Sequence, residues 1–255
     1  MKIVFIGAGN LATCLALEMN RHAYNTVQVY SRTMESARLL AGKINARPIN
    51  DFKEIDSSAD LYIFSVKDSI LPGLLQQMPS NNGIWIHTAG SVPINIFEKY
   101  SDRYGVVYPF QTFSKDREID FGNIPFFMEA NGPETFDSLK EIFGKISRNI
   151  TELSSEKRKY LHLTGVFACN FVNHMYRISS DILEKEGIPF ESVLPLIEET
   201  ASKIHSMTPE EAQTGPAIRF DENIIKEHIF LLDDEHRKEI YALISKDIHE
   251  TNSKI

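Results

Sequence analysis

The chain has 255 residues, 42% of them hydrophobic, which is enough to bury the core of one large domain or two modest ones. Its 27 lysines and arginines against 35 aspartates and glutamates give a formal net charge of -8, which excludes a general basic surface for nucleic acid or an anionic membrane. Because the first predicted strand begins at Ile3 and no apolar run approaches membrane-spanning length, we expect a cytoplasmic protein with no signal peptide, nucleic-acid partner or membrane partner.

The first predicted strand leads directly into the turn Gly7-x-Gly9-x-x-Ala12, and a helix follows. Gly7 permits a tight turn, Gly9 leaves room for a pyrophosphate, and Ala12 lets the helix pack closely on the sheet. The N-terminal amides of this helix, at Asn10 and Leu11, would face the phosphates. An ordinary turn that binds nothing is the alternative, but the order of strand, turn, helix and second strand favours a dinucleotide site.

The end of the second predicted strand, Tyr30-Ser31-Arg32-Thr33, indicates which dinucleotide binds. NAD sites usually place a carboxylate here for the ribose hydroxyls, and this chain has none. Arg32 could pair with a 2′-phosphate to which Ser31 and Thr33 donate, which favours NADP over NAD. Alternatively, Ser31 or Thr33 simply caps the helix that begins near Met34.

Strands and helices alternate up to about Leu153, which predicts a mostly parallel sheet with helices on both faces, a Rossmann domain over residues 1–153. Cys14 and Cys169 fall in predicted helices, where they suit reduced packing residues and neither a disulfide nor a metal site. The predicted strands are Ile3–Ile6, Val27–Tyr30, Leu61–Val66, Gly83–His87, Gly105–Val107, Phe126–Glu129 and Asn149–Leu153.

From Ser154 onward the pattern is helical and predicts an all-helical domain over residues 154–255. Thr208-Pro209-Glu210-Glu211 has the pattern of a capping box, and Gly215-Pro216 is expected to break the helices. The predicted helices are Ser155–Lys185, Phe190–Ile204, Thr208–Gln213, Asp221–Leu232 and Asp234–His249.

Polar residues follow several of the predicted strands, at the edge where such sheets bind ligands. We expect Val66 and the turn of Thr88, Gly90 and Ser91 to contact the cofactor. Turn chemistry alone is the alternative for each of them. Asp68 and Ser69 are expected to cap a helix.

Two polar groups in the helical region could contact a substrate. His162 could donate a proton, and Asn170, predicted to be buried among Val166, Phe167 and Phe171, would need a polar partner. Asn173 and His174, on the same predicted helix, could simply be exposed. In the second group, Arg219 could bind a substrate carboxylate, followed by Asp221, which either orients Arg219 or caps the next helix, and by His228.

The chain resembles, over nearly its whole length, a family of two-domain bacterial proteins described as Rossmann-like oxidoreductases, similar to pyrroline-carboxylate reductase and the β-hydroxyacid dehydrogenases. The resemblance implies a Rossmann domain, a helical dimerisation domain and a nicotinamide cofactor at their junction, and it supplies no substrate. It is carried by Gly7-Ala8-Gly9-Asn10, His87-Thr88-Ala89-Gly90-Ser91, Pro109-Phe110-Gln111-Thr112-Phe113, His162 through Asn170, and Thr214-Gly215-Pro216-Ala217 with Arg219, Asp221 and His228.

The chain also departs from these relatives. Cys169 stands where the β-hydroxyacid dehydrogenases carry a proton-donating lysine, between Gly165 and Asn173, so that the donor must come from elsewhere and His162 is the first candidate. Tyr108 replaces a histidine expected before Pro109, and Phe220 replaces a usual glycine.

These observations predict an NADP-dependent oxidoreductase that moves a hydride between the nicotinamide and a small, carboxylate-bearing carbonyl or imine compound. His162, Asn170 and Arg219 are its expected catalytic residues. The alternative is a non-catalytic dinucleotide sensor, which the missing lysine favours. The apolar residues Ile224, Ile225, Ile229 and Leu232 could pack internally or form a homodimer.

Overall fold

The computed structural model describes residues 1–252 and divides into two compact units, Met1–Asn170 and the part that begins at Phe171. The change from strands to helices falls near the predicted boundary, because strand β8 ends at Glu152 and helix α5 begins at Ser155. The first compact unit nevertheless extends along this helix to Asn170.

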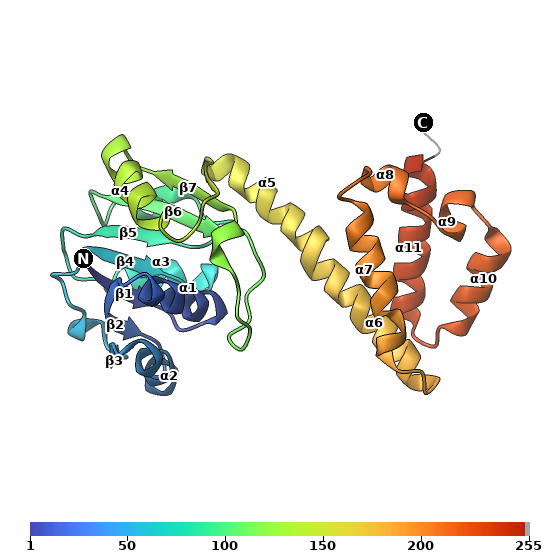
Figure 1. Ribbon diagram of the computed structural model, residues 1–255, viewed down its shortest axis with the longest axis horizontal. Helices are drawn as coiled ribbons and strands as arrows, with labels where there is room; N and C mark the ends of the chain where they lie inside the picture. Colours follow the sequence, from blue (N-terminus) through green and yellow to red (C-terminus); the bar gives the residue numbers. More distant parts are fainter. Residues whose placement is uncertain (253–255) are drawn as a thin grey trace. The chain divides into compact units, whose positions relative to one another are not determined.

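The first unit contains one eight-stranded sheet with the order β3-β2-β1-β4-β5-β6-β7-β8 (Figure 1). All neighbouring strands are parallel except β6 and β7, so the predicted Rossmann-type fold is confirmed. The strand order reverses at β1 and β4, which is where such sheets bind ligands. The strands are β1 Lys2–Ile6, β2 Asn25–Tyr30, β3 Arg47–Ile49, β4 Leu61–Phe64, β5 Ile84–His87, β6 Tyr104–Pro109, β7 Phe126–Ala130 and β8 Ile150–Glu152.

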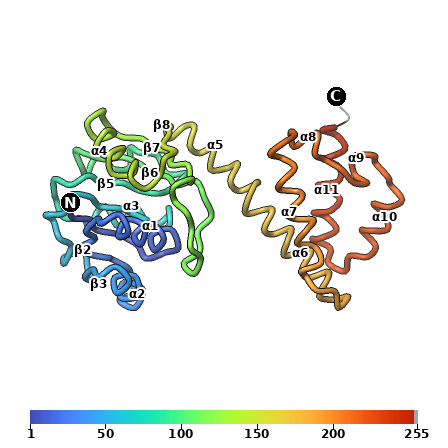
Figure 2. Tube along the Cα trace, viewed as in Figure 1, coloured from blue at the N-terminus to red at the C-terminus, as the bar shows by residue number. Residues whose placement is uncertain are grey.

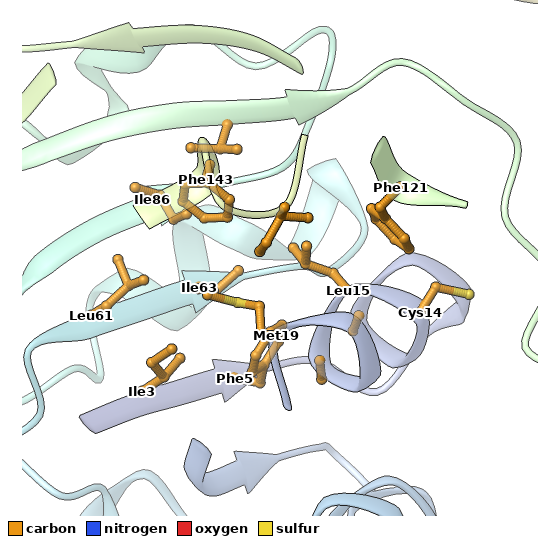
Figure 3. Close-up of a cluster of buried hydrophobic side chains, with 14 of the residues drawn as sticks. Ile3, Phe5, Cys14, Leu15, Met19, Leu61, Ile63, Ile86, Phe121 and Phe143 are labelled. Carbon is orange, nitrogen blue, oxygen red and sulfur yellow. The ribbon is translucent and has the colours of Figure 1, made fainter. Parts of the chain in front are cut away.

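Alternate residues of β1 supply the two faces of the sheet. Ile3 and Phe5 pack with Leu15 and Met19 of helix α1 in one core, which Figure 3 shows. Val4 belongs to the core of the opposite face. Every one of these side chains is fully buried, and each contributes about 1.5–3 kcal/mol of hydrophobic free energy. The helices of this sheet domain are α1 Asn10–Arg21, α2 Met34–Ile44, α3 Leu71–Leu75 and α4 Pro133–Phe143.

A single helical path runs from Ser155 to Lys185, as predicted (Figure 2). It consists of α5 Ser155–Gly165, a π-helical segment Val166–Phe171, and α6 Val172–Lys185. A π-helical turn inside an α-helix often marks a functional position, and this one contains Cys169 and Asn170.

The second unit continues with further helices. Thr208 and Glu211 form the predicted capping box at the start of α8. Helix α9 was not predicted, because Gly215-Pro216 was interpreted as a break, whereas Pro216 occupies the first helical turn. None of the helices within residues 1–252 is long and apolar enough to cross a membrane. The remaining helices are α7 Leu194–Lys203, α8 Pro209–Ala212, α9 Pro216–Arg219, α10 Glu222–Leu231 and α11 Glu235–Asn252.

Candidate functional site

The turn between β1 and α1 has the geometry of a dinucleotide site. Gly7 has φ +122°, and a Cβ atom there would lie 2.1 Å from the carbonyl oxygen of Ser65 in the neighbouring strand connection. A Cβ atom at Gly9 would meet no atom within 4 Å, so the space in front of Gly9 is open. The first helical bond runs from the Thr13 amide to the Gly9 carbonyl, and the three amides before it have no acceptor within the helix. This cradle fits a pyrophosphate.

In the turn after β2, one residue caps the next helix and another is left free for a phosphate. Thr33 caps α2, because its Oγ1 accepts a hydrogen bond from the Ser36 amide at 3.4 Å. The Ser31 amide donates to the Ile49 carbonyl. Arg32 is exposed and makes no hydrogen bond or ion pair within residues 1–252. The capping alternative is therefore confirmed for Thr33, and the Arg32 guanidinium stays available to a phosphate.

The connections after β4 and β5 are tied to each other. Thr88 is buried, and its hydroxyl donates to Ser65 Oγ at 3.2 Å. The Ser91 hydroxyl donates to the carboxylate of Asp68. The expectation that Asp68 and Ser69 cap a helix is wrong, because the short 3-10 helix Asp68–Ile70 has no side-chain cap. Val66 is half-buried beside Gly7, at 3.1 Å from the position of a Cβ there.

Gly90, Tyr108 and His162 meet at one point of the first unit. The hydroxyl of Tyr108, at the end of β6, shares a 2.9 Å hydrogen bond with Nδ1 of His162 on α5. A Cβ atom at Gly90 would lie 2.6 Å from that nitrogen and 2.8 Å from Tyr108 Cζ, so only glycine allows this approach. Burial raises the pKa of Tyr108 to about 12, which keeps the phenol protonated at neutral pH.

Sequence reasoning identified His162 and Gly90 but not their partner. Tyr108 is predicted as one of the strand-end residues and as a departure from a family pattern, but its pairing depends on where α5 packs. A second glycine allows this helix to pack closely, because a Cβ atom at Gly165 would lie 2.9 Å from the ring of Phe110. The strand-end position of Tyr108 gave no indication of His162 as its partner.

Of the other two predicted catalytic residues, Asn170 belongs to the first unit and Arg219 to the second. Asn170 is exposed, so its expected burial among Val166, Phe167 and Phe171 is wrong. Arg219 ends helix α9 in the second unit, and its use by the site stays a prediction. Asp221 caps α10 by accepting from the Ile224 amide at 3.4 Å, and makes no bond to Arg219. Nδ1 of His228 shares a 2.7 Å bond with the Tyr241 hydroxyl.

Across residues 1–252 no group of three or more histidine, cysteine, aspartate or glutamate side chains is placed to hold a metal ion. Cys14 and Cys169 are free thiols, and burial raises the pKa of Cys14.

Two protein-family models match the chain. Residues 2–88 match the family described as NADP oxidoreductase, coenzyme F420-dependent, and residues 124–248 match a domain of unknown function, DUF2520. No curated protein matches the chain.

Solved structures extend this comparison over the whole chain. The "putative NADP oxidoreductase BF3122" from Bacteroides fragilis is 49% identical, with a TM-score of 0.92 and 98% of each chain covered. The fold is shared by a reductive aminase from Aspergillus terreus at 13% identity (TM-score 0.72; 99% of this chain and 92% of that chain). It is also shared by 1-pyrroline-5-carboxylate reductase from Streptococcus pyogenes at 14% identity (TM-score 0.62; 100% and 97%).

These matches confirm the predicted resemblance, and at the level of the family they confirm the predictions of an oxidoreductase and of NADP as its cofactor. The chain belongs to a family of two-domain, Rossmann-type NADP oxidoreductases.

Proposed function

We propose that this protein transfers a hydride between NADP and a small, carboxylate-bearing carbonyl or imine compound, with Tyr108 and His162 handling the proton. The observation that carries this proposal is the hydrogen bond between these two side chains beside Gly90, in the same unit as the dinucleotide turn. The reaction requires a cofactor cradle and a proton donor, and one unit contains candidates for both.

The cofactor would be held by residues at the carboxyl ends of the parallel strands. The open backbone at Gly9 and the amides of Asn10 and Leu11 would bind the pyrophosphate, and Arg32 with Ser31 and Thr33 would bind the 2′-phosphate. Val66, Thr88, Gly90 and Ser91 would line the nicotinamide end. When bound, NADPH supplies the hydride, and the protein supplies orientation and exclusion of water.

The proton would come from the Tyr108 and His162 pair. A carbonyl or imine that accepts a hydride at carbon gains negative charge on its oxygen or nitrogen, and that atom must take up a proton. The Tyr108 phenol keeps its proton at neutral pH, and the imidazole can exchange protons with both the phenol and solvent. This pair replaces the lysine that is absent at Cys169.

Arg219 is the proposed anchor for the substrate carboxylate. Its guanidinium is exposed and unpaired within residues 1–252, which an anion-binding residue requires. Replacing Arg219 with Ala should raise the KM for substrate far more than the Kd for NADPH. Equal weakening of both would contradict this assignment. Asn170, also exposed, is proposed to polarise the reacting group.

A cytoplasmic homodimer formed through the second unit is also proposed. Among residues 171–252 only Ala217 and Ser245 are buried, and many large apolar side chains of this unit are exposed. Phe230 is 87% exposed and Leu243 is 69% exposed. Monomeric proteins rarely expose so much apolar surface, and a second copy would cover it. Light scattering should give twice the chain mass, and Phe230→Asp should reduce it, while Leu39→Asp, an exposed leucine of the first unit, should not.

The function is tested by following NADPH oxidation at 340 nm in the presence of oxo-acids and cyclic imines, with hydroxy-acids tested in the reverse direction. Turnover of one class supports the enzyme. The second candidate, a sensor without turnover, is favoured by the absence of a lysine at Cys169, and it predicts NADPH binding with no turnover across the panel.

A further inference from the structure

Arg158 is a buried cation that the proposed chemistry does not use. Its side chain is fully buried in the first part of α5, and its Nη1 lies 2.8 Å from Oε2 of Glu129 on β7. Its Nη2 donates to the Val92 carbonyl at 2.7 Å and to Ser155 Oγ at 3.0 Å. The guanidinium thus connects a strand, a loop and a helix that are distant in the sequence.

Ser155 closes the same network. Its hydroxyl donates to Glu129 Oε2 at 2.5 Å and accepts a hydrogen bond from the Ile94 amide at 2.9 Å. The loop after β5 is therefore held at two points, the Val92 carbonyl and the Ile94 amide, by two side chains of α5 that Glu129 of β7 binds in turn. This is the loop that begins with Thr88, Gly90 and Ser91.

Stability alone is a poor explanation for such a network. Burying a guanidinium removes its hydration, and the partly exposed carboxylate of Glu129 loses part of its own, so apolar residues of similar volume often serve stability as well. The Nε atom of Arg158 has no hydrogen-bond partner within residues 1–252, which adds to that cost. The geometric precision that a forked, multiply bonded side chain imposes is a benefit that apolar packing cannot supply.

The network is joined to the site in two ways, through the loop after β5 and through helix α5. Val92 is two residues from Gly90, whose backbone is in close contact with His162 and Tyr108. His162 follows Arg158 by four residues, about one helical turn, so the two side chains project from the same side of α5. Fixing Arg158 therefore fixes both the backbone of Gly90 and the rotation of α5 that brings His162 to Tyr108.

We propose that Arg158, with Glu129 and Ser155, is a positioning residue that sets the hydrogen bond between His162 and Tyr108. The part of this inference that concerns catalysis rests on the proposed function. The geometric part concerns the unliganded protein, and it is tested there.

The test uses the imidazole signals of the 15N-labelled full-length protein, recorded without cofactor and assigned with His162→Gln. The hydrogen bond of one ring nitrogen sets which of the two nitrogens carries the proton. Tyr108→Phe therefore provides the 15N shifts of a His162 that has lost its partner. We expect Arg158→Lys, which keeps the charge and loses the fork, to move the His162 signals toward the Tyr108→Phe values. Lys157→Met, the exposed neighbour on α5, should leave them at the wild-type positions.

Ser155→Ala is measured alongside, because it keeps both charges and is expected to fold even if Arg158→Lys does not. It should move the His162 signals in the same direction by a smaller amount. The proposal would be overturned if a folded Arg158→Lys protein gave His162 signals at the wild-type positions. If Arg158→Lys does not fold, wild-type His162 signals in Ser155→Ala would overturn it. Failure of the wild type to bind NADPH would instead contradict the proposed function and leave this result intact.

Discussion

Tyr108 and His162 are 54 residues apart in the sequence, and their side chains share a 2.9 Å hydrogen bond. One lies at the end of a central strand and the other on the helix that follows the last strand. The bond exists because Gly90 has no side chain to separate the two rings.

Replacing Tyr108 with Phe removes the hydroxyl and retains the ring that packs at 5.9 Å from Phe110. If the phenol takes part in proton transfer, kcat should fall by about 100-fold, the lower end of the range for a general acid. The Kd for NADPH should not change. Steady-state kinetics and calorimetry separate the two effects. Tyr100→Phe, at an exposed position, is the control, and equal activity of the two variants would remove Tyr108 from the mechanism.

Replacing Gly90 with Ala places a methyl group 2.6 Å from His162 Nδ1. One ring or the loop must move, at a cost of about 1–3 kcal/mol in the free energy of unfolding, and the hydrogen bond should be lost. Gly42→Ala is the matched control, because a Cβ there meets nothing within 4 Å and alanine favours the helix. Urea unfolding measures the difference, and equal stability of both variants would contradict the geometry.

The two glycines of the dinucleotide turn should respond differently to alanine. Gly7→Ala should unfold or strongly destabilise the protein, because φ is +122° and the methyl group would collide with the Ser65 carbonyl. Gly9→Ala should fold normally, since the backbone there is extended and the space is open. It should nevertheless weaken NADPH binding, because the methyl group occupies the pyrophosphate space. A Gly9→Ala protein that binds NADPH as the wild type does would disprove the cradle.

Much of the fold follows from local pattern. Alternating strands and helices with a glycine turn after β1 are enough to predict the Rossmann domain, and the helix over 155–185 follows from its periodicity. Strand β3 was not predicted, because Arg47-Pro48-Ile49 is too short to show a hydrophobic period and contains a proline. Proline suits an edge strand, which is the place of β3 in the sheet.

Only those residues of the site that lie within one local sequence motif could be predicted. Gly9 and Arg32 lie in a local strand, turn and helix pattern, whereas the pairing of Tyr108 with His162 depends on the packing of α5. Arg158 could not be identified either, because its partners lie 29 and 66 residues away and a lysine- and arginine-rich helix start predicts an exposed face. Asn170 was expected to be buried because its neighbours are apolar, but two of those neighbours, Phe167 and Phe171, are exposed too.

His87 makes stability depend on pH. Burial, assisted by the charge of Arg158, lowers its pKa from 6.5 to about 3. Below pH 6.5 the unfolded chain therefore binds a proton that the folded protein does not, and the free energy of unfolding falls as the pH falls toward 3. Between pH 7.5 and 5.5 this residue should account for a loss of about 1 kcal/mol.

Urea unfolding followed by the fluorescence of Trp85, the only tryptophan, measures this loss in the first unit. His87→Asn keeps an acceptor for the Ala89 amide and should remove the loss, whereas His205→Gln, at an exposed position, should not. The same loss in His87→Asn would assign it to another group.

Binding of NADP by Arg32 and the glycine turn is tested by calorimetric titration of the wild type, Arg32→Ala and Arg38→Ala with NADPH and NADH. Arg38 is an exposed arginine of the adjacent helix α2 and controls for general charge. We predict that the wild type prefers NADPH, that Arg32→Ala loses about tenfold or more in NADPH affinity with little change for NADH, and that Arg38→Ala matches the wild type. Absence of binding by either nucleotide, or equal affinities that Arg32→Ala leaves unchanged, would contradict the claim.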